Sequence, residues 1–348
     1  MLSFLKLAQP CQIQKIGHIR IIAALWVFVF HYYHFISHSF FPPLESTNPL
    51  YLLIYHGYFC VYIFFLLSGY LLSKSHAKTL NLKTFFSKRV GRILPPYYLC
   101  LVIYCLLFTH KLPDITLWFA VLNTDTQIYP NPLGHFWFIN RLLECYLCFP
   151  LLSALQQKTG KIGLFIAYLS CVLIGAYWVI ENQITLAIYY GSFILCLSHF
   201  IFGMLVIDLP VMKKPIISAS LALLVFILLL EYLHQLIWQA PLNHYGFTII
   251  WFNMLALILS MLIRAYLYTP LCLPNFINKG LDKLAQISYE IYLYHFLVIY
   301  FFIEHADLLF ANQTLNFISL LILSLFSAFF FQCLLAGFNR GILRIKRA

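Results

Sequence analysis

An arginine and a histidine interrupt an apolar stretch near the amino terminus of this 348-residue chain. Arg20 and His31 are 11 residues apart, so on a helix they share one face, roughly 20° and about 16 Å apart. If Arg20 marks a membrane boundary, His31 lies near the middle of a hydrocarbon core roughly 30 Å thick. A titratable group at that depth is costly and functional by default. His31 is therefore a candidate catalytic base, although a hydrogen bond to a neighbouring helix would also explain it.

Glu144 is a second candidate catalytic residue in an apolar stretch. It follows His135 by nine residues, about 13 Å along a helix, which is close to the expected depth of His31. Arg141 lies three residues before Glu144 and on the same face. Two interpretations stay open. Glu144 orients His31 or an acceptor hydroxyl, or it forms an ion pair with Arg141 within one helix.

The densest cationic segment, residues 85–98, contains Arg89 and Arg92. Their i, i+3 spacing places both side chains on one helix face. Two adjacent arginines form a fork for phosphate oxygens, which predicts an anionic ligand from the cytoplasm, with Arg20 as a third candidate contact. The alternative is that these arginines anchor lipid headgroups.

Four further residues are candidates for binding an acceptor or supporting the site. Ser288, Tyr292 and His295 are spaced i, i+4, i+7, so they line one stripe of a helix and either bind a ligand or form hydrogen bonds between helices. Ser68 precedes Gly69, and this small pair is either functional or a notch for a neighbouring helix. The sequence contains no metal-ligand cluster, serine nucleophile motif or glycine-rich nucleotide motif.

The elements that position these residues are apolar helices. The chain is 62% hydrophobic and 9% charged, with a mean hydropathy of +0.86, far outside the range of soluble domains. We expect an all-α polytopic membrane protein with about ten transmembrane helices, in a single domain over residues 1–348 with no appended soluble domain. The candidate helices are about 19–38, 52–72, 95–110, 135–155, 162–181, 187–207, 214–233, 246–267, 287–303 and 315–338.

The basic residues predict the orientation of these helices, because Lys and Arg collect in cytoplasmic loops. With the amino terminus inside, 20 of the 22 basic residues fall in cytoplasmic segments; the other two are Lys111, in an outer loop, and Arg141, within a helix. Both termini should therefore be cytoplasmic. The +11 net charge is then an orientation signal and no indication of nucleic acid binding. No cleavable signal peptide is apparent, and the ten cysteines suggest no disulfide framework.

Five motifs follow one another along nearly the whole chain. They are the Arg20 and His31 pair, Phe-Phe-x-x-Ser-Gly-Tyr at 64–70, Arg-x-x-Arg with Ile-Leu-Pro-x-Tyr at 89–97, a Trp-containing helix ending in Pro at 135–150, and Ser-Tyr-x-x-Tyr-Leu-x-His at 288–295. In content and order they resemble the acyltransferase-3 family. The chain departs from the common family pattern at residues 16–20, where many members have Leu-Asp-x-Leu-Arg, and at Tyr62, where many have Asp.

The resemblance implies a ten-helix membrane enzyme that moves an acyl group, commonly acetyl from acetyl-CoA, to a hydroxyl of an extracytoplasmic sugar or polysaccharide such as lipopolysaccharide O-antigen. Acyl-CoA would be the donor substrate, and no permanently bound cofactor is expected. Arg20, Arg89 and Arg92 would hold the donor phosphates, and His31 would act as general base or, less favoured, carry the acyl group. The expected partners are acyl-CoA, a glycan or lipid-linked sugar, and the lipid bilayer of a bacterial inner membrane, with no nucleic acid.

A transporter or flippase for a glycan or anionic substrate is the competing hypothesis, since buried Arg, His and Glu also mark substrate and proton paths. An inverted repeat would favour a transporter, and none is evident in the sequence. A membrane scaffold without chemistry would leave His31 and Glu144 unexplained.

Overall fold

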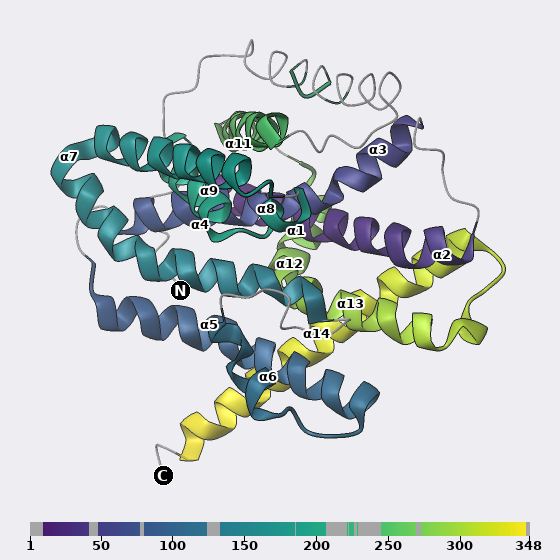
Figure 1. Cartoon of the computed structure of the whole chain (residues 1–348). Coiled ribbons are helices and arrows are strands. Elements are labelled where there is room, and N and C mark those ends of the chain that lie inside the picture. Colours follow the sequence, from purple (N-terminus) through teal and green to yellow (C-terminus); the bar gives the residue numbers. More distant parts are fainter. Residues whose placement is uncertain are drawn as a thin grey trace.

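The computed structural model describes residues 10–41, 48–76, 80–123, 133–184, 186–206, 245–268 and 273–345, with a few positions between 221 and 228. These residues form helices joined by short connections, and no strand occurs among them (Figure 1). The prediction of an all-α fold is confirmed.

The helices follow the apolar spans predicted from the sequence. They are α1 (Pro10–Tyr32), continued by a π-helical segment (Tyr33–Ser37) and α2 (His38–Phe40); α3 (Pro49–Tyr55); α4 (Cys60–Ser75); α5 (Leu82–Tyr104), continued by a second π-helical segment (Cys105–Thr109); and α6 (Ile115–Phe119). A 3₁₀ turn (Leu133–Phe136) precedes α7 (Trp137–Glu181), followed by α8 (Leu186–Tyr190), α9 (Phe193–Val206), α11 (Tyr245–Tyr268), α12 (Asn275–Gln286), α13 (Ser288–Glu304) and α14 (Gln313–Ile345).

The described helices make the chain an integral membrane protein. Five segments are long and apolar enough to cross a bilayer: Gln12–Ser37, Leu53–Ser75, Leu82–Thr109, Leu133–Glu181 and Gln313–Gly337. A sixth arises if α12 and α13, bent by 68°, count as one span, and α9 and α11 contain shorter apolar helices. The described residues therefore contain five to six candidate spans, against about ten expected. The expected helix at 214–233 lies mostly outside the described residues.

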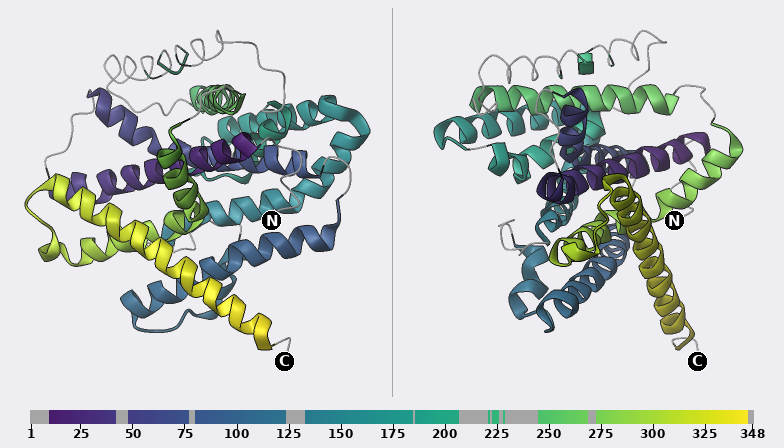
Figure 2. Two further views of the ribbon diagram at one scale, coloured as in Figure 1. Left: turned by 180° about the vertical axis from the view of Figure 1, so that it is seen from behind. Right: turned by 90° about the vertical axis from the view of Figure 1, so that its right-hand side faces the viewer.

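Part of the difference in number lies within α7. This helix contains two expected spans, 135–155 and 162–181, which join at Gly160 (φ 66°, ψ −147°). A glycine adopts this positive φ without the steric cost of a side chain. The two arms of α7 double back on each other at this point (Figures 1 and 2), so α7 is a helical hairpin.

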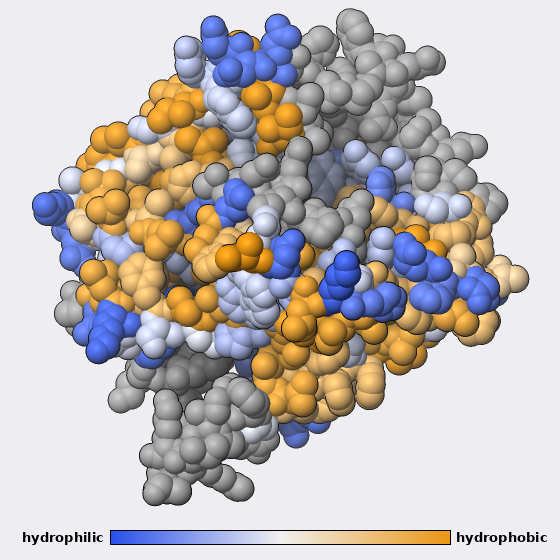
Figure 3. Space-filling model, turned by 60° about the horizontal axis from the view of Figure 1, so that its bottom comes forward, coloured by the Kyte–Doolittle hydropathy of each residue, from blue (hydrophilic) through white to orange (hydrophobic). Residues whose placement is uncertain are grey.

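Helices α1, α4 and α5 and the two arms of α7 run roughly alongside one another across the view of Figure 1, whereas α14 crosses them obliquely and α11 is seen nearly end-on. Helix α4 ends and α5 begins near the bend of α7, at one end of the molecule, and the turn from α13 to α14 lies at the other (Figures 1 and 2). The basic residues at the end of α4, at the start of α5 and at the bend of α7 thus share one end. Broad hydrophobic areas cover the face shown in Figure 3, and α14 exposes apolar side chains such as Phe326 and Phe330, which suits contact with lipid.

Two glycines set the contact between α4 and α9. A Cβ atom on Gly69 would lie 1.9 Å from the carbonyl oxygen of Phe200, and one on Gly203 would lie 2.0 Å from that of Leu66. Small residues let membrane helices approach this closely. The packing notch predicted at Ser68 and Gly69 is therefore formed by Gly69, which leaves the Ser68 hydroxyl for another role.

Two tyrosines of α13 attach it to α5 close to the prolines of that helix. Pro95 and Pro96 lack the N–H groups that would continue the helical ladder. Beside these prolines, the hydroxyl of Tyr289 donates to the carbonyl of Ile93 (3.0 Å), and that of Tyr294 donates to the carbonyl of Pro96 (3.2 Å). These bonds hold the cationic first half of α5 against the start of α13.

Candidate active site

One cavity brings together all three arginines that the sequence singled out. Arg20 comes from α1, and Arg89 and Arg92 come from α5. Ser68 of α4 and Tyr292 of α13 line the same cavity. Its remaining wall is apolar and aromatic, from Phe64, Leu67, Leu71, Leu72, Ile93, Phe138, Leu142, Tyr146 and Tyr289. A cationic site with a long apolar wall suits a ligand that has an anionic head and an extended arm.

The guanidinium groups in this cavity retain hydrogen-bonding capacity. The Arg89 guanidinium carbon lies 5.4 Å from the ring centroid of Tyr146 and 5.8 Å from that of Phe85, a cation–π arrangement that holds the side chain in place. The buried Nε of Arg89 has no hydrogen-bond partner among the described residues. Arg92 is exposed and Arg20 is half-buried. This cavity therefore offers donors to an anion from two helices.

Three histidines from separate elements meet beside this cavity. The Nδ1 atom of His31 (α1) lies 2.8 Å from Nε2 of His295 (α13). His135, from the 3₁₀ turn before α7, has its ring centroid 5.5 Å from that of His295 and 6.5 Å from that of His31. His295 is fully buried, and His31 is half-buried. His295 was predicted either to bind a ligand or to form a hydrogen bond between helices. Its contact with His31 of α1 favours the hydrogen bond between helices.

The hydrogen bonds of His295 fix the proton positions on His31. Nδ1 of His295 lies 2.9 Å from the carbonyl oxygen of Ile291, and a carbonyl only accepts, so Nδ1 carries the proton. In a neutral imidazole Nε2 is then the acceptor, and His31 must donate to it from Nδ1. The lone pair of His31 is therefore on Nε2. This is the arrangement that a histidine general base requires.

Tyr292 connects the cavity to the histidines. Its hydroxyl donates to the backbone carbonyl of His135 (2.7 Å), and its ring centroid lies 5.6 Å from that of His135 and 6.0 Å from that of His295. On the cavity side, the ring of Phe138 packs against Tyr292 with a centroid distance of 4.8 Å. The arginine cavity and the histidine cluster are therefore neighbours that share one aromatic wall.

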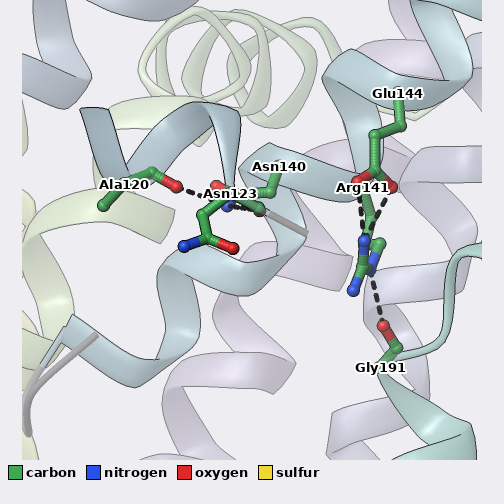
Figure 4. Close-up of polar contacts among 6 residues, drawn as sticks. All are labelled: Ala120, Asn123, Asn140, Arg141, Glu144 and Gly191. Carbon is green, nitrogen blue, oxygen red and sulfur yellow. Dashed lines mark hydrogen bonds and ion pairs between the residues drawn. The ribbon is translucent and has the colours of Figure 1, made fainter. Parts of the chain in front are cut away.

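The structure does not bring Glu144 to His31. Glu144 accepts two hydrogen bonds from Nη1 of Arg141, at 2.7 and 2.8 Å, and Nε of Arg141 donates to the carbonyl of Gly191 (2.7 Å). Figure 4 shows this pair beside Asn140, which donates to the carbonyls of Ala120 and Asn123. Of the two interpretations, the geometry favours the ion pair within α7, with Arg141 anchoring the chain before α9.

Ser288 is not among the residues that line the arginine cavity. Its hydroxyl donates to the carbonyl of Ala285 (3.0 Å) at the break between α12 and α13, and it is buried. This local bond supports the start of α13 and so acts on the site only through the position of that helix.

Sequence reasoning missed two residues near the site. His135 served only as a landmark at the start of a motif, although an intramembrane histidine is itself a signal. Glu290 is the second of these residues. It is a buried carboxylate in an apolar helix, and the rule that ionisable residues in membrane spans are functional would have found it.

The comparison with protein families agrees with this geometry. A family model described as an acyltransferase domain matches residues 13–336, a range that contains every arginine and histidine of the site. The chain has no significant match among the curated proteins or among the solved structures. Because the family match covers nearly the whole chain, the chain belongs to the acyltransferase-3 family and is a membrane acyltransferase.

Proposed function

We propose that this protein is an O-acyltransferase, in its most specific form an O-acetyltransferase. It transfers an acyl group from cytoplasmic acyl-CoA to a hydroxyl of an extracytoplasmic sugar or surface polysaccharide, such as lipopolysaccharide O-antigen, in a bacterial inner membrane. The observation that carries this proposal is the shared wall between a three-arginine cavity and a histidine whose Nε2 lone pair is free.

The donor would bind in the arginine cavity. Arg20, Arg89 and Arg92 offer planar donors that match phosphate oxygens, and Arg guanidinium groups bind phosphate in bidentate fashion. The apolar wall suits the pantetheine arm, which carries the thioester toward the histidines. Since Tyr292 stands between the cavity and the cluster, the arm reaches His31 past the edge of this ring.

His31 would perform the proton transfers. Its Nε2 accepts the proton of the acceptor hydroxyl while that oxygen attacks the thioester carbonyl carbon. The C–S bond then breaks, and the imidazolium returns the proton to the departing thiolate, which leaves as CoA. His295 is the positioning residue, because its acceptor Nε2 holds the His31 proton on Nδ1. Ser68 and Tyr292 remain candidates for contacts with the donor arm or the acceptor.

The proposed reaction requires the arginine cavity to open toward the cytoplasm, where the donor is. We propose ten spans with both termini in the cytoplasm, so that the basic segments at 74–92 and 158–161 face the cytoplasmic donor. The uneven distribution of Lys and Arg supports this orientation.

Mass analysis of surface glycans tests the reaction. Cells that produce the wild-type chain should show glycans heavier by an acyl-sized increment than cells that produce His31→Gln at equal membrane abundance. The glutamine keeps hydrogen-bonding capacity but lacks a titratable base, and a positioned base contributes roughly 10²–10⁴-fold. Substantial acylation by His31→Gln would defeat the proposed mechanism, and identical glycans with and without the gene would defeat the proposed function.

A further inference from the structure

Glu290 is a buried carboxylate that the proposed reaction does not use. It lies in the first turn of α13, next to Tyr289, which lines the arginine cavity. The residue is only 9% exposed, and its Oε2 has no hydrogen-bond partner among the described residues. Burying a polar oxygen without a partner costs free energy, so this position calls for an explanation.

Burial opposes the ionised form of Glu290, whereas two features of the surroundings favour it. It interacts electrostatically with Arg92 and Arg20, two of the three arginines that line the cavity. The first turn of a helix also carries a partial positive charge from its unpaired N–H groups, which stabilises a carboxylate there.

Glu290 does not hold these arginines by direct contact. Among the described residues, neither Arg20 nor Arg92 forms an ion pair or hydrogen bond with it. A carboxylate that oriented the guanidinium groups would contact them. The Glu290 carboxylate instead acts through space. It lowers the net charge of the cavity and leaves the N–H groups of Arg20 and Arg92 available to a ligand.

The resulting charge balance matches one phosphate group of the ligand. With Glu290 ionised, three guanidinium groups and one carboxylate carry a net charge of +2, from +3 and −1. A phosphate monoester or a pyrophosphate at neutral pH carries about two negative charges, since the second pKa of a phosphate monoester is about 6. The donor acyl-CoA and the product CoA carry the same phosphates. Any excess attraction would therefore bind both equally, and it would slow product release without speeding the chemistry.

We propose that Glu290 is the internal counter-charge of the donor cavity, which limits the affinity for CoA and so allows the product to leave. This inference rests on the proposed function, because it takes acyl-CoA as the donor. It predicts that removal of the charge makes binding tighter, whereas removal of a structural residue would make it weaker.

The test is CoA binding to the purified full-length chain in lipid nanodiscs, with Glu290→Gln compared with the wild type. Loss of one negative charge near the phosphates should tighten CoA binding by about tenfold at low salt, and less at high salt because screening weakens the effect. Turnover limited by product release should fall. Glu304→Gln makes the same change at the exposed far end of α13 and should match the wild type in both measurements.

The outcomes separate this inference from the function on which it rests. If the wild type binds CoA and Glu290→Gln binds it equally or more weakly, the counter-charge is refuted while the donor assignment stands. If the wild type fails to bind CoA, the donor assignment falls and this inference with it. Should the glutamine variant be poorly produced, Glu290→Met removes the same charge and carries the same expectation. Dephospho-CoA, which lacks the 3′-phosphate, identifies the phosphate involved. If Glu290→Gln also binds dephospho-CoA more tightly than the wild type does, the arginines bind the pyrophosphate. If the two proteins bind dephospho-CoA equally, the arginines bind the 3′-phosphate.

Discussion

His295→Phe gives the most direct test of how the histidine cluster works. The substitution keeps an aromatic ring in the fully buried position but removes the Nε2 acceptor that lies 2.8 Å from Nδ1 of His31. His31 then has no partner that holds its proton on Nδ1. The proton can then move to Nε2, which removes the lone pair that the proposed chemistry needs.

The size of the effect follows from the lost bond. A buried donor left without its acceptor costs about 1–3 kcal/mol, and each 1.36 kcal/mol corresponds to a factor of about ten in rate. We expect kcat to fall roughly 10- to 100-fold, less than for His31→Gln. The donor KM should stay unchanged, because His295 does not line the arginine cavity.

The assay is acyl transfer at saturating acyl-CoA, normalised to folded protein. His295→Gln should recover part of the lost activity, since its side-chain oxygen can accept from His31. His199→Phe is the matched control, because His199 is also fully buried but stacks on Tyr62, away from the cluster. Full activity of His295→Phe, or equal losses in the phenylalanine and glutamine variants, would refute the positioning role.

Three further predictions test the cavity, the topology and the fold. Replacing both Arg89 and Arg92 with Ala should weaken CoA binding by roughly 10- to 100-fold per lost charged hydrogen bond and leave acceptor use little changed; undiminished CoA affinity would return both residues to lipid anchoring. A carboxy-terminal alkaline phosphatase fusion should be inactive, because phosphatase needs the extracytoplasmic side, and activity would overturn the proposed orientation. Gly69→Val should destabilise the protein by about 1–3 kcal/mol, measured as a lower midpoint of thermal unfolding in detergent, since a Cβ there meets the Phe200 carbonyl at 1.9 Å; an unchanged midpoint would contradict the close contact of α4 and α9.

Features that depend on local spacing and hydropathy can be predicted from the sequence alone. Apolar spans of helical length predicted the membrane helices, and the break in α7 at Gly160 falls between two of them. Helical periodicity likewise related Arg89 to Arg92, and both line the cavity with Arg20. The all-helical character and the shared face of Arg89 and Arg92 could be predicted because each involves residues within one helix, where geometry follows directly from residue number.

Which helix faces meet depends on the packing of the whole chain. His31 and His295 are 264 residues apart, and no local pattern states that they share a hydrogen bond or which nitrogen carries the proton. Glu144 had two open interpretations, and the placement of Arg141 between Glu144 and Gly191 favours the ion pair. The charge balance around Glu290 also needs α1, α5 and α13 together. The physical reason is that packing between membrane helices depends on the shapes of whole faces, such as the Gly69 and Gly203 contact, and these are not encoded in the periodicity of either helix.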